Sequence, residues 1–252
     1  MPLRAIIWDV DGTLAETERD GHLVAFNLAF EALNLAWRWG QQRYGELLTV
    51  TGGFERLLFD MAVQATAPVA VAEREQLARR LHQLKNEAYA QIVAEGRIAL
   101  REGVRELMDD CSAAGVPMAI ATTTSRSNVD ALLGSQLGAA WRERFACVLC
   151  GEDVQRKKPD PQVYTLALQT LGVPAHQALA IEDSPVGVRA CVAAGVPVIV
   201  TRSVYFAEDA LPGALAVGPG LGSAQGWSLS APPRLSAARV DLGTLRHWFG
   251  SV

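Results

Sequence analysis

Short apolar segments alternate with helical patterns over most of this chain, and this alternation limits its possible folds more than any other feature. From about residue 98 onward, expected strands and helices follow one another in regular order. The expected strands are Val116–Ala121, Cys147–Leu149, Ala178–Ile181 and Val196–Val200, and the expected helices are Arg101–Ala114, Ser125–Leu137, Pro161–Leu171 and Pro185–Ala194. Gly115, Gly172 and Gly195 follow three of these helices, where a left-handed residue is favoured. The order predicts an α/β fold, a Rossmann-like doubly wound parallel sheet with helices on both faces.

Residues 18–96 interrupt this rhythm and contain no convincing strand. Apolar residues recur there at helical spacing over Leu23–Leu33, Phe54–Ala65 and Ala72–Ala94. The pattern predicts an α-helical domain over residues 18–96, inserted after the first strand of a core domain made of residues 1–17 and 97–252. Five aromatic residues are expected to form the small core of this insertion: Phe26, Phe30, Trp37, Trp39 and Phe59.

The last part of the chain has a weaker pattern. Pro219–Leu235 is rich in Gly, Ser, Ala and Pro, so we expect a loosely packed surface excursion there. A final amphipathic helix, over about Asp241–Phe249, is expected to dock back on the core.

The composition is that of an ordinary globular protein and argues against several functional classes. A net charge of −4 gives no basic footprint for nucleic acid, and no apolar stretch approaches the roughly 20 residues that span a bilayer. The first strand is expected from Leu3, which leaves no room for a leader and makes a cytoplasmic location the default expectation. The four cysteines are expected to be core residues in a reducing compartment, with Cys147 and Cys150 on opposite faces of a strand. They are Cys111, Cys147, Cys150 and Cys191.

The first expected strand ends in two carboxylates, Asp9 and Asp11, followed at once by Gly12 and Thr13. Residues two apart in an extended chain point to the same face. Both carboxylates can therefore converge beyond the carboxyl end of the strand, where open α/β sheets bind ligands. The alternative is that these residues simply begin a turn.

Two later segments carry groups that suit an anion. Thr122 and Thr123 end a buried strand just before a helix, where hydroxyl and N–H groups can hold a phosphate; the alternative is a helix N-cap at Thr124 or Ser125. Lys158 precedes a proline at the mouth of another helix, so its backbone is biased to an extended form. Its charge can neutralise phosphate oxygens, or it can belong to an ordinary solvated loop.

A further strand ends in Glu182 and Asp183, which repeats the pattern of the first strand. With Asp9 and Asp11 they supply an oxygen-rich cluster of the kind that binds Mg²⁺. The alternative is that Asp183 or Ser184 only caps the following helix. Four such segments along one expected sheet are poorly explained by four separate coincidences.

These segments resemble the four motifs of the haloacid dehalogenase superfamily, in the branch of small phosphatases and phosphoglucomutases with a helical cap after the first motif. The matching motifs are Asp9-x-Asp11-Gly12-Thr13, Thr122, Lys158-Pro159 and Glu182-Asp183. Within the branch, the chain is most similar to the CbbY-type phosphatases. The supporting strings are Thr13-Leu14-Ala15-Glu16-Thr17-Glu18, Thr51-Gly52-Gly53-x-Glu55-Arg56, Ala121-Thr122-Thr123-Thr124-Ser125 and Lys157-Lys158-Pro159. The resemblance runs from Leu3 to about Val200 and is weak beyond that.

The resemblance implies a Mg²⁺-dependent phosphatase that works through an aspartyl-phosphate. Asp9 would attack phosphorus, and Asp11 would act first as general acid and then as general base. The metal would be held by Asp9, by the backbone carbonyl of Asp11 and by Asp183, with Glu182 acting through water. The remaining phosphate charge would be taken by three residues, Thr122, Thr123 and Lys158.

The resemblance also implies that the insertion closes over the site and reads the leaving group. The implied substrate-binding residues are Glu16, Glu18 and His22 at the junction of core and cap, and Gly52, Gly53 and Arg56 in a loop that reaches into it. Arg56 would bind a second phosphate by a bidentate contact, unless it forms a surface ion pair with Glu55 or Asp60. His22 can equally be an ordinary helix-face residue. The implied substrate is a small sugar bisphosphate, with xylulose 1,5-bisphosphate as the leading candidate.

Two departures from the family pattern weaken the bisphosphate expectation. Phe54 stands where a Lys is expected in the G-G-K-E-R string, and one extra residue separates Glu18 from His22. Both favour a monophosphorylated sugar or a broad substrate range. A mutase of the β-phosphoglucomutase kind is an alternative, although Thr13 favours hydrolysis, and a non-catalytic binding protein is another. The expected partner is a small phosphorylated sugar, without nucleic acid or membrane, and the expected state is a monomer, with a dimer as the alternative.

Overall fold

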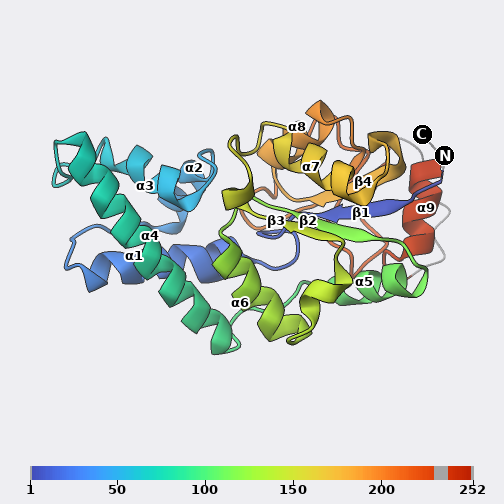
Figure 1. The fold of residues 1–252 in the computed structure, drawn as a ribbon, viewed down its shortest axis with the longest axis horizontal. Helices are drawn as coiled ribbons and strands as arrows, with labels where there is room; N and C mark the ends of the chain where they lie inside the picture. Colours follow the sequence, from blue (N-terminus) through green and yellow to red (C-terminus); the bar gives the residue numbers. More distant parts are fainter. Residues whose placement is uncertain (1, 230–237, 251–252) are drawn as a thin grey trace.

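A computed structural model of the chain describes residues 2–229 and 238–250. Its centre is a seven-stranded sheet in the order β3-β2-β1-β4-β5-β6-β7 (Figure 1). The strands are β1 (Ala5–Trp8), β2 (Met118–Ala121), β3 (Cys147–Leu149), β4 (Ala178–Glu182), β5 (Val198–Thr201), β6 (Ala216–Gly218) and β7 (Ser228–Leu229). Strands β1 to β6 are parallel, and β7 is antiparallel to β6.

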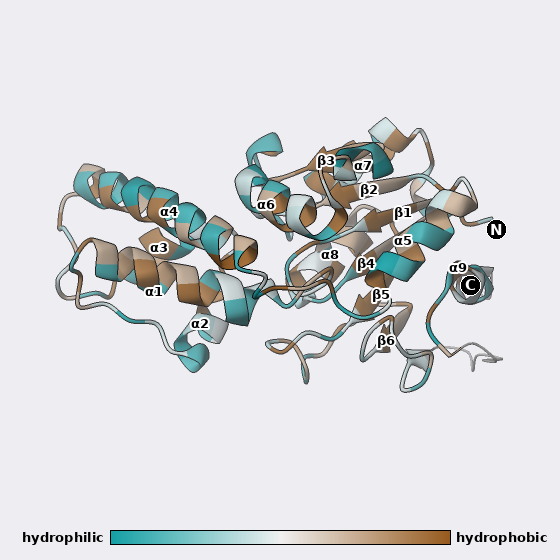
Figure 2. Cartoon of the chain, turned by 90° about the horizontal axis from the view of Figure 1, so that it is seen from below, coloured by the Kyte–Doolittle hydropathy of each residue, from teal (hydrophilic) through white to brown (hydrophobic). Residues whose placement is uncertain are grey.

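Helices cover both faces of the sheet. They are α5 (Val104–Ala113), α6 (Arg126–Leu137) and α9 (Leu242–Gly250) on one face, and α7 (Gln162–Leu171) and α8 (Pro185–Ala193) on the other. Alternate strand residues feed the two apolar layers, so Ile6 packs in the first and Ile7 in the second. Figure 1 shows helices on either side of the strands, and Figure 2 shows that the strands themselves are mostly apolar. The predicted doubly wound parallel sheet is therefore confirmed, and Cys147 and Cys150 do pack in opposite layers.

Four helices lie beside the carboxyl ends of the strands (Figure 1), and we call them the helical layer. They are α1 (Leu23–Ala32), α2 (Gln41–Leu47), α3 (Gly53–Met61) and α4 (Val71–Ala94), preceded by a π-helical turn over Glu18–His22. Residues 18–96 contain no strand, as their pattern predicted.

The aromatic core of the helical layer differs from its prediction at one position. Phe26, Phe30, Trp37 and Trp39 are buried together as expected. The prediction for Phe59 is wrong: this side chain is 54% exposed. Helix α3 turns Leu57, Asp60 and Met61 inward, which leaves Phe59 on the outer face.

Two predicted segments differ from the structure at one end. The helix expected from Arg101 begins only at Val104, because Gly103 has a left-handed backbone with φ +83°. Residues 219–227 form neither helix nor strand, as expected, but Ser228–Leu229 form β7, which pairs with β6, and the Trp227 ring packs 4.9 Å from that of Trp248. Residues 230–235 of that prediction lie outside the described residues.

Candidate active site

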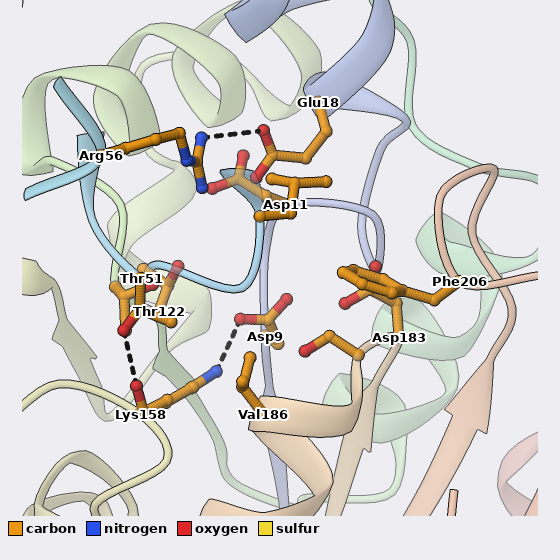
Figure 3. Close-up of a pocket in the computed structure, with 13 residues that line it drawn as sticks. Asp9, Asp11, Glu18, Thr51, Arg56, Thr122, Lys158, Asp183, Val186 and Phe206 are labelled. Atoms are coloured by element: carbon orange, nitrogen blue, oxygen red, sulfur yellow. Dashed lines mark hydrogen bonds and ion pairs between the residues drawn. The ribbon is translucent and has the colours of Figure 1, made fainter. Parts of the chain in front are cut away.

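The chemistry-bearing segments meet at the carboxyl ends of β1, β2 and β4, in a cavity that we call the sheet-side cavity (Figure 3). Its lining includes six residues singled out from the sequence at this edge: Asp9, Asp11, Thr122, Thr123, Lys158 and Asp183. Glu182 lies directly behind them and is fully buried. Parallel strands bring their carboxyl ends to one edge, so residues more than a hundred positions apart become neighbours.

Lys158 is the centre of the charged contacts in this cavity. Its Nζ donates to Asp9 Oδ1 at 2.7 Å and to Glu182 Oε1 at 2.6 Å. Burial alone would lower the pKa of Lys158, but the carboxylates of Asp9 and Glu182 raise it above its usual range. Lys158 is 3% exposed, so its expected alternative role in a solvated loop is excluded. The site thus keeps a permanent positive charge beside Asp9.

Three carboxylates lie close together around this lysine. One oxygen from each of Asp9, Glu182 and Asp183 falls within 4.8 Å of the others, and all three residues are buried. Burial, followed by repulsion from Glu182, raises the pKa of Asp9 from 3.8 to about 7. Burial and the nearby Asp9 charge raise the pKa of Asp183 well above its ordinary value. One lysine cannot balance three buried carboxylates, and all-oxygen donors suit a hard divalent cation. The donor set therefore fits Mg²⁺.

The backbone around the cluster leaves no room for larger residues. Gly12 has φ +80°, and a Cβ there would lie 2.0 Å from Asp183 Oδ2. The loop after β1 therefore needs glycine to pass Asp183. Ser184 caps helix α8 by accepting a hydrogen bond from the Gly187 N–H at 3.1 Å. Ser184 is therefore the residue that caps the helix, and the Asp183 carboxylate is free to belong to the acid cluster.

The Asp11 carboxylate lies in the same cavity but faces the helical layer. Its Oδ1 accepts a hydrogen bond from Thr17 Oγ1 at 2.5 Å and lies 2.9 Å from His22 Nε2. Burial opposes ionisation of Asp11, but His22 and Thr17 hold its pKa well below the ordinary value. His22 is itself buried and stacks on Tyr89, so it is more than a helix-face residue. The two aspartates of the first motif thus have different electrostatic surroundings.

The hydroxyl segment after β2 faces the cavity rather than capping the next helix. Thr122 is buried, and its Oγ1 accepts from the Thr124 N–H at 3.2 Å. Ser125 occupies the N-cap position of α6 without a side-chain hydrogen bond to that helix. The N-cap alternative therefore does not explain this segment.

A second cavity adjoins the first within the helical layer, and we call it the helix-side cavity. It is lined by Asp11, Glu18, His22, Phe26, Gly52, Gly53, Arg56, Lys85, Thr123 and Thr124. Arg56 lines both cavities, and its Nη1 donates to the Tyr44 hydroxyl at 2.7 Å. The same atom lies 3.8 Å from Glu18 Oε2, and Figure 3 shows this ion pair. Arg56 is 6% exposed, so the alternative of a surface ion pair is wrong.

Glu55 and Asp60, the alternative partners of Arg56, form ion pairs with other residues. Glu55 pairs with Lys157 at 2.6 Å and Asp60 with Arg43 at 2.6 Å. The Arg56 guanidinium is therefore held at the cavity wall.

Lys85 also lines this cavity, although no sequence motif indicated it. It is 3% exposed and lies 5.3 Å and 5.4 Å from the ring centres of Phe26 and Tyr89. Burial lowers its pKa from 10.5 to about 8, although Asp11 and Glu18 act in the opposite direction. The signal was present in α4, because Lys85 falls at helical spacing between the buried Leu81 and Tyr89.

Two residues from the sequence analysis lie elsewhere. Glu16 does not line either described cavity; its Oε1 lies 3.8 Å from Arg101 Nε, and Oε2 accepts a weak hydrogen bond from the Val204 N–H. Phe54 is partly buried against the aromatic core of the helical layer. The sheet-side cavity has further lining residues that were not expected at the site: Leu48, Thr51, Ser184, Val186 and Phe206.

Comparison with known proteins gives the same result as the motifs. A family model for haloacid dehalogenase-like hydrolases matches residues 3–195. The plasmid-encoded CbbY protein of Cupriavidus necator is 42% identical over 246 residues, which cover 98% of this chain and 96% of that protein. The similarity therefore continues beyond Val200, where the motif resemblance is weak.

Solved structures are similar over the same region. CbbY from Rhodobacter sphaeroides in complex with phosphate has a TM-score of 0.79 and 42% identity, and covers 84% of this chain and 92% of that one. A mutant of that protein in complex with xylulose-(1,5)bisphosphate has a TM-score of 0.82 and 40% identity, covering 90% and 100%. The family model matches most of this chain, and the similarity to a CbbY protein covers nearly all of both sequences. This chain therefore belongs to the haloacid dehalogenase-like hydrolases, in the branch of the CbbY proteins.

Proposed function

We propose that this protein is a Mg²⁺-dependent phosphatase that hydrolyses a small phosphorylated sugar through an aspartyl-phosphate on Asp9. The observation that carries the proposal is the convergence of Asp9, Lys158 and Asp183 on one buried cavity, with Asp11 at its other side. Hydrolysis of a phosphate monoester is very slow without a catalyst, so charge neutralisation and positioning have to lower a high barrier.

In the first step, a carboxylate oxygen of Asp9 bonds to phosphorus and the bond from phosphorus to the sugar oxygen breaks. Asp11 gives its proton to that leaving oxygen. In the second step, Asp11 takes a proton from water, and the resulting hydroxide oxygen bonds to phosphorus and frees Asp9. The contacts with Thr17 and His22 support the second role, because they favour the carboxylate form of Asp11 that takes the proton from water. For the first step Asp11 has to bind a proton, which the negative charge of a bound phosphate favours.

The remaining groups bind and neutralise the phosphoryl group. Lys158 places its ammonium beside Asp9, and Thr122 and Thr123 bring hydroxyl groups to the same cavity. Asp9, the Asp11 backbone carbonyl and Asp183 would hold Mg²⁺. When bound there, Mg²⁺ would offset the repulsion between the carboxylates and the phosphate. Glu182 would act through water, since its Oε1 already accepts from Lys158 and from the Tyr164 hydroxyl at 2.6 Å.

The leaving group would occupy the helix-side cavity. The CbbY structure with xylulose-(1,5)bisphosphate supports a sugar bisphosphate as the substrate. Phe54 removes the expected cation of the G-G-K-E-R string, but Arg56 and the buried Lys85 both face this cavity. Two cations of this kind match the charge of a second phosphate. We therefore retain xylulose 1,5-bisphosphate as the leading candidate, ahead of a monophosphorylated sugar.

A phosphate-release assay with purified protein tests this proposal. The substrates would be xylulose 1,5-bisphosphate, several sugar monophosphates and β-glucose 1-phosphate, each with Mg²⁺ and with EDTA. We expect Mg²⁺-dependent phosphate release that is fastest for the bisphosphate. Conversion of β-glucose 1-phosphate to the 6-phosphate would instead establish the mutase, and no reaction with any ester would favour a binding protein.

A further inference from the structure

Arg101 gathers backbone carbonyls from three loops that follow different strands. It lies on the connection that returns from α4 to the sheet, two residues before Gly103. Its Nη1 donates to the carbonyls of Gly12 and Thr201, the latter at 3.2 Å. Its Nη2 donates to the carbonyls of Arg202 at 2.6 Å and Pro219 at 3.0 Å. One side chain thus joins the loops after β1, β5 and β6.

Two of these loops enclose Asp183. The Gly12 backbone passes so close to the Asp183 carboxylate that no side chain fits between them. The segment after β5 carries Ser203, whose Cβ would lie 3.1 Å from a Cβ added at Gly12. Arg101 therefore fixes the segments on both sides of Asp183 without touching the acid cluster itself.

Arg101 also contacts both connections between the sheet and the helical layer. Its backbone N–H donates to the Leu14 carbonyl at 2.8 Å, and the preceding Leu100 forms an antiparallel bridge with Ala15. Its Nε lies 3.8 Å from Glu16 Oε1. The outgoing and returning segments are thus paired at this arginine.

We propose that Arg101 is a positioning residue that holds the Asp9–Gly12 loop in register with Asp183 and ties that loop to both connections of the helical layer. The inference deepens the proposed function and rests on it for its kinetic part. The planar guanidinium explains the choice of arginine, because its N–H groups point in fixed, diverging directions toward four carbonyls. A lysine ammonium cannot reach the same set of acceptors.

The test compares Arg101→Lys and Arg101→Ala with the control Arg97→Gln. Arg97 lies on the same connection. Within the described part of the chain its one ion pair is with the exposed Glu95, at 3.7 Å. We expect kcat to fall about 10²-fold in both Arg101 variants, the effect typical of a small displacement of reacting groups. KM should change little, because Arg56 and Lys85 are untouched, and the Arg97 variant should match the wild type.

Hydrogen exchange provides a readout that needs no substrate or metal. The amides of Gly12, Thr13 and Leu14 are hydrogen-bonded within the loop after β1. They should exchange faster in the Arg101 variants, while those of α7 should not.

Guanidinium rescue separates positioning from general destabilisation. A cavity of about 200 Å³, lined by Arg101, Pro219, Gly220 and Gly222, borders the side chain. Free guanidinium ion should therefore restore kcat and slow exchange in Arg101→Ala, whereas methylammonium should not.

The inference would be overturned if Arg101→Lys had the kcat and the hydrogen exchange of the wild type. If Arg101→Ala does not fold, the lysine variant alone tests the inference. Rescue by methylammonium as effective as by guanidinium would also overturn it. If the wild type itself releases no phosphate, the proposed function fails, and the exchange of the loop amides still tests whether Arg101 positions the loop.

Discussion

Asp9 and Asp11 are two residues apart, yet their environments differ sharply. Burial, followed by repulsion from Glu182, raises the pKa of Asp9 to about 7, whereas Asp11 contacts Thr17 and His22, which lower its pKa. Asp9→Asn should abolish turnover, because the amide is not a nucleophile, without lowering the melting temperature. The neutral amide removes one member of a repelling group and keeps the shape of the side chain. Phosphate release and thermal unfolding check both parts, and turnover within a few-fold of the wild type would contradict the role of Asp9.

The burial of the Lys85 ammonium should lower the stability of the folded protein. A pKa lowered from 10.5 to about 8 corresponds to about 3 kcal/mol of destabilisation while the folded protein holds the proton. Between these pH values the unfolded chain binds more protons than the folded one, so this cost is full below pH 8 and fades as pH rises toward 10.5.

Lys85→Met should therefore be more stable than the wild type at pH 7, and the difference should narrow by about 2 kcal/mol at pH 10. Urea unfolding of both proteins at the two pH values measures this change, and the comparison cancels the titration of other groups. A difference that is independent of pH would show that Lys85 is not buried as an ammonium.

At the scale of single elements, helix α8 contains a glycine that helix propensity alone would disfavour. Gly187 lies in the first turn of α8, and a Cβ there would fall 2.0 Å from the Glu182 carboxylate. Glu182 cannot move aside, because Lys158 and Tyr164 both donate to its Oε1.

Gly187→Ala should therefore destabilise the protein by about 1–3 kcal/mol, despite the higher helix propensity of alanine. It should also reduce phosphate release, because displacement of Glu182 moves Lys158. Gly134→Ala is the matched control: Gly134 lies inside α6 with open space at its Cβ position, so this change should stabilise by up to about 1 kcal/mol. Equal effects of the two substitutions in urea unfolding would contradict the steric argument.

For the whole molecule, the sequence was sufficient to predict features that depend on a short-range pattern or on the order of the strands. The motifs at Asp9, Thr122, Lys158 and Asp183 each end a strand or open a helix, and parallel strands bring such ends together. Residues whose position depends on the packing of distant segments could not be found this way. Phe206 follows β5 in a loop without a repeating pattern and reaches the sheet-side cavity only in three dimensions.

The same reasoning applies to other places where the structure differs from the sequence pattern. Strand β7 has only two residues, too few for a period to be recognised, and it lies in a segment rich in Gly, Ser and Pro. Glu16 follows the first motif directly, but its side chain faces Arg101 instead of either cavity.

Binding of Mg²⁺ should be visible in the stability of the entire molecule. A ligand that binds only the folded state stabilises it by about 2.7 kcal/mol at a hundred times its Kd. Because protons compete with a cation for carboxylates, and Asp9 has a pKa of about 7 without metal, the rise in melting temperature with Mg²⁺ should be larger at pH 8 than at pH 6. Asp9→Asn should remove most of this rise, while Arg97→Gln should keep it. Calorimetric scans with and without Mg²⁺ measure the effect, and an equal rise in the Asp9 variant would place the metal outside the acid cluster.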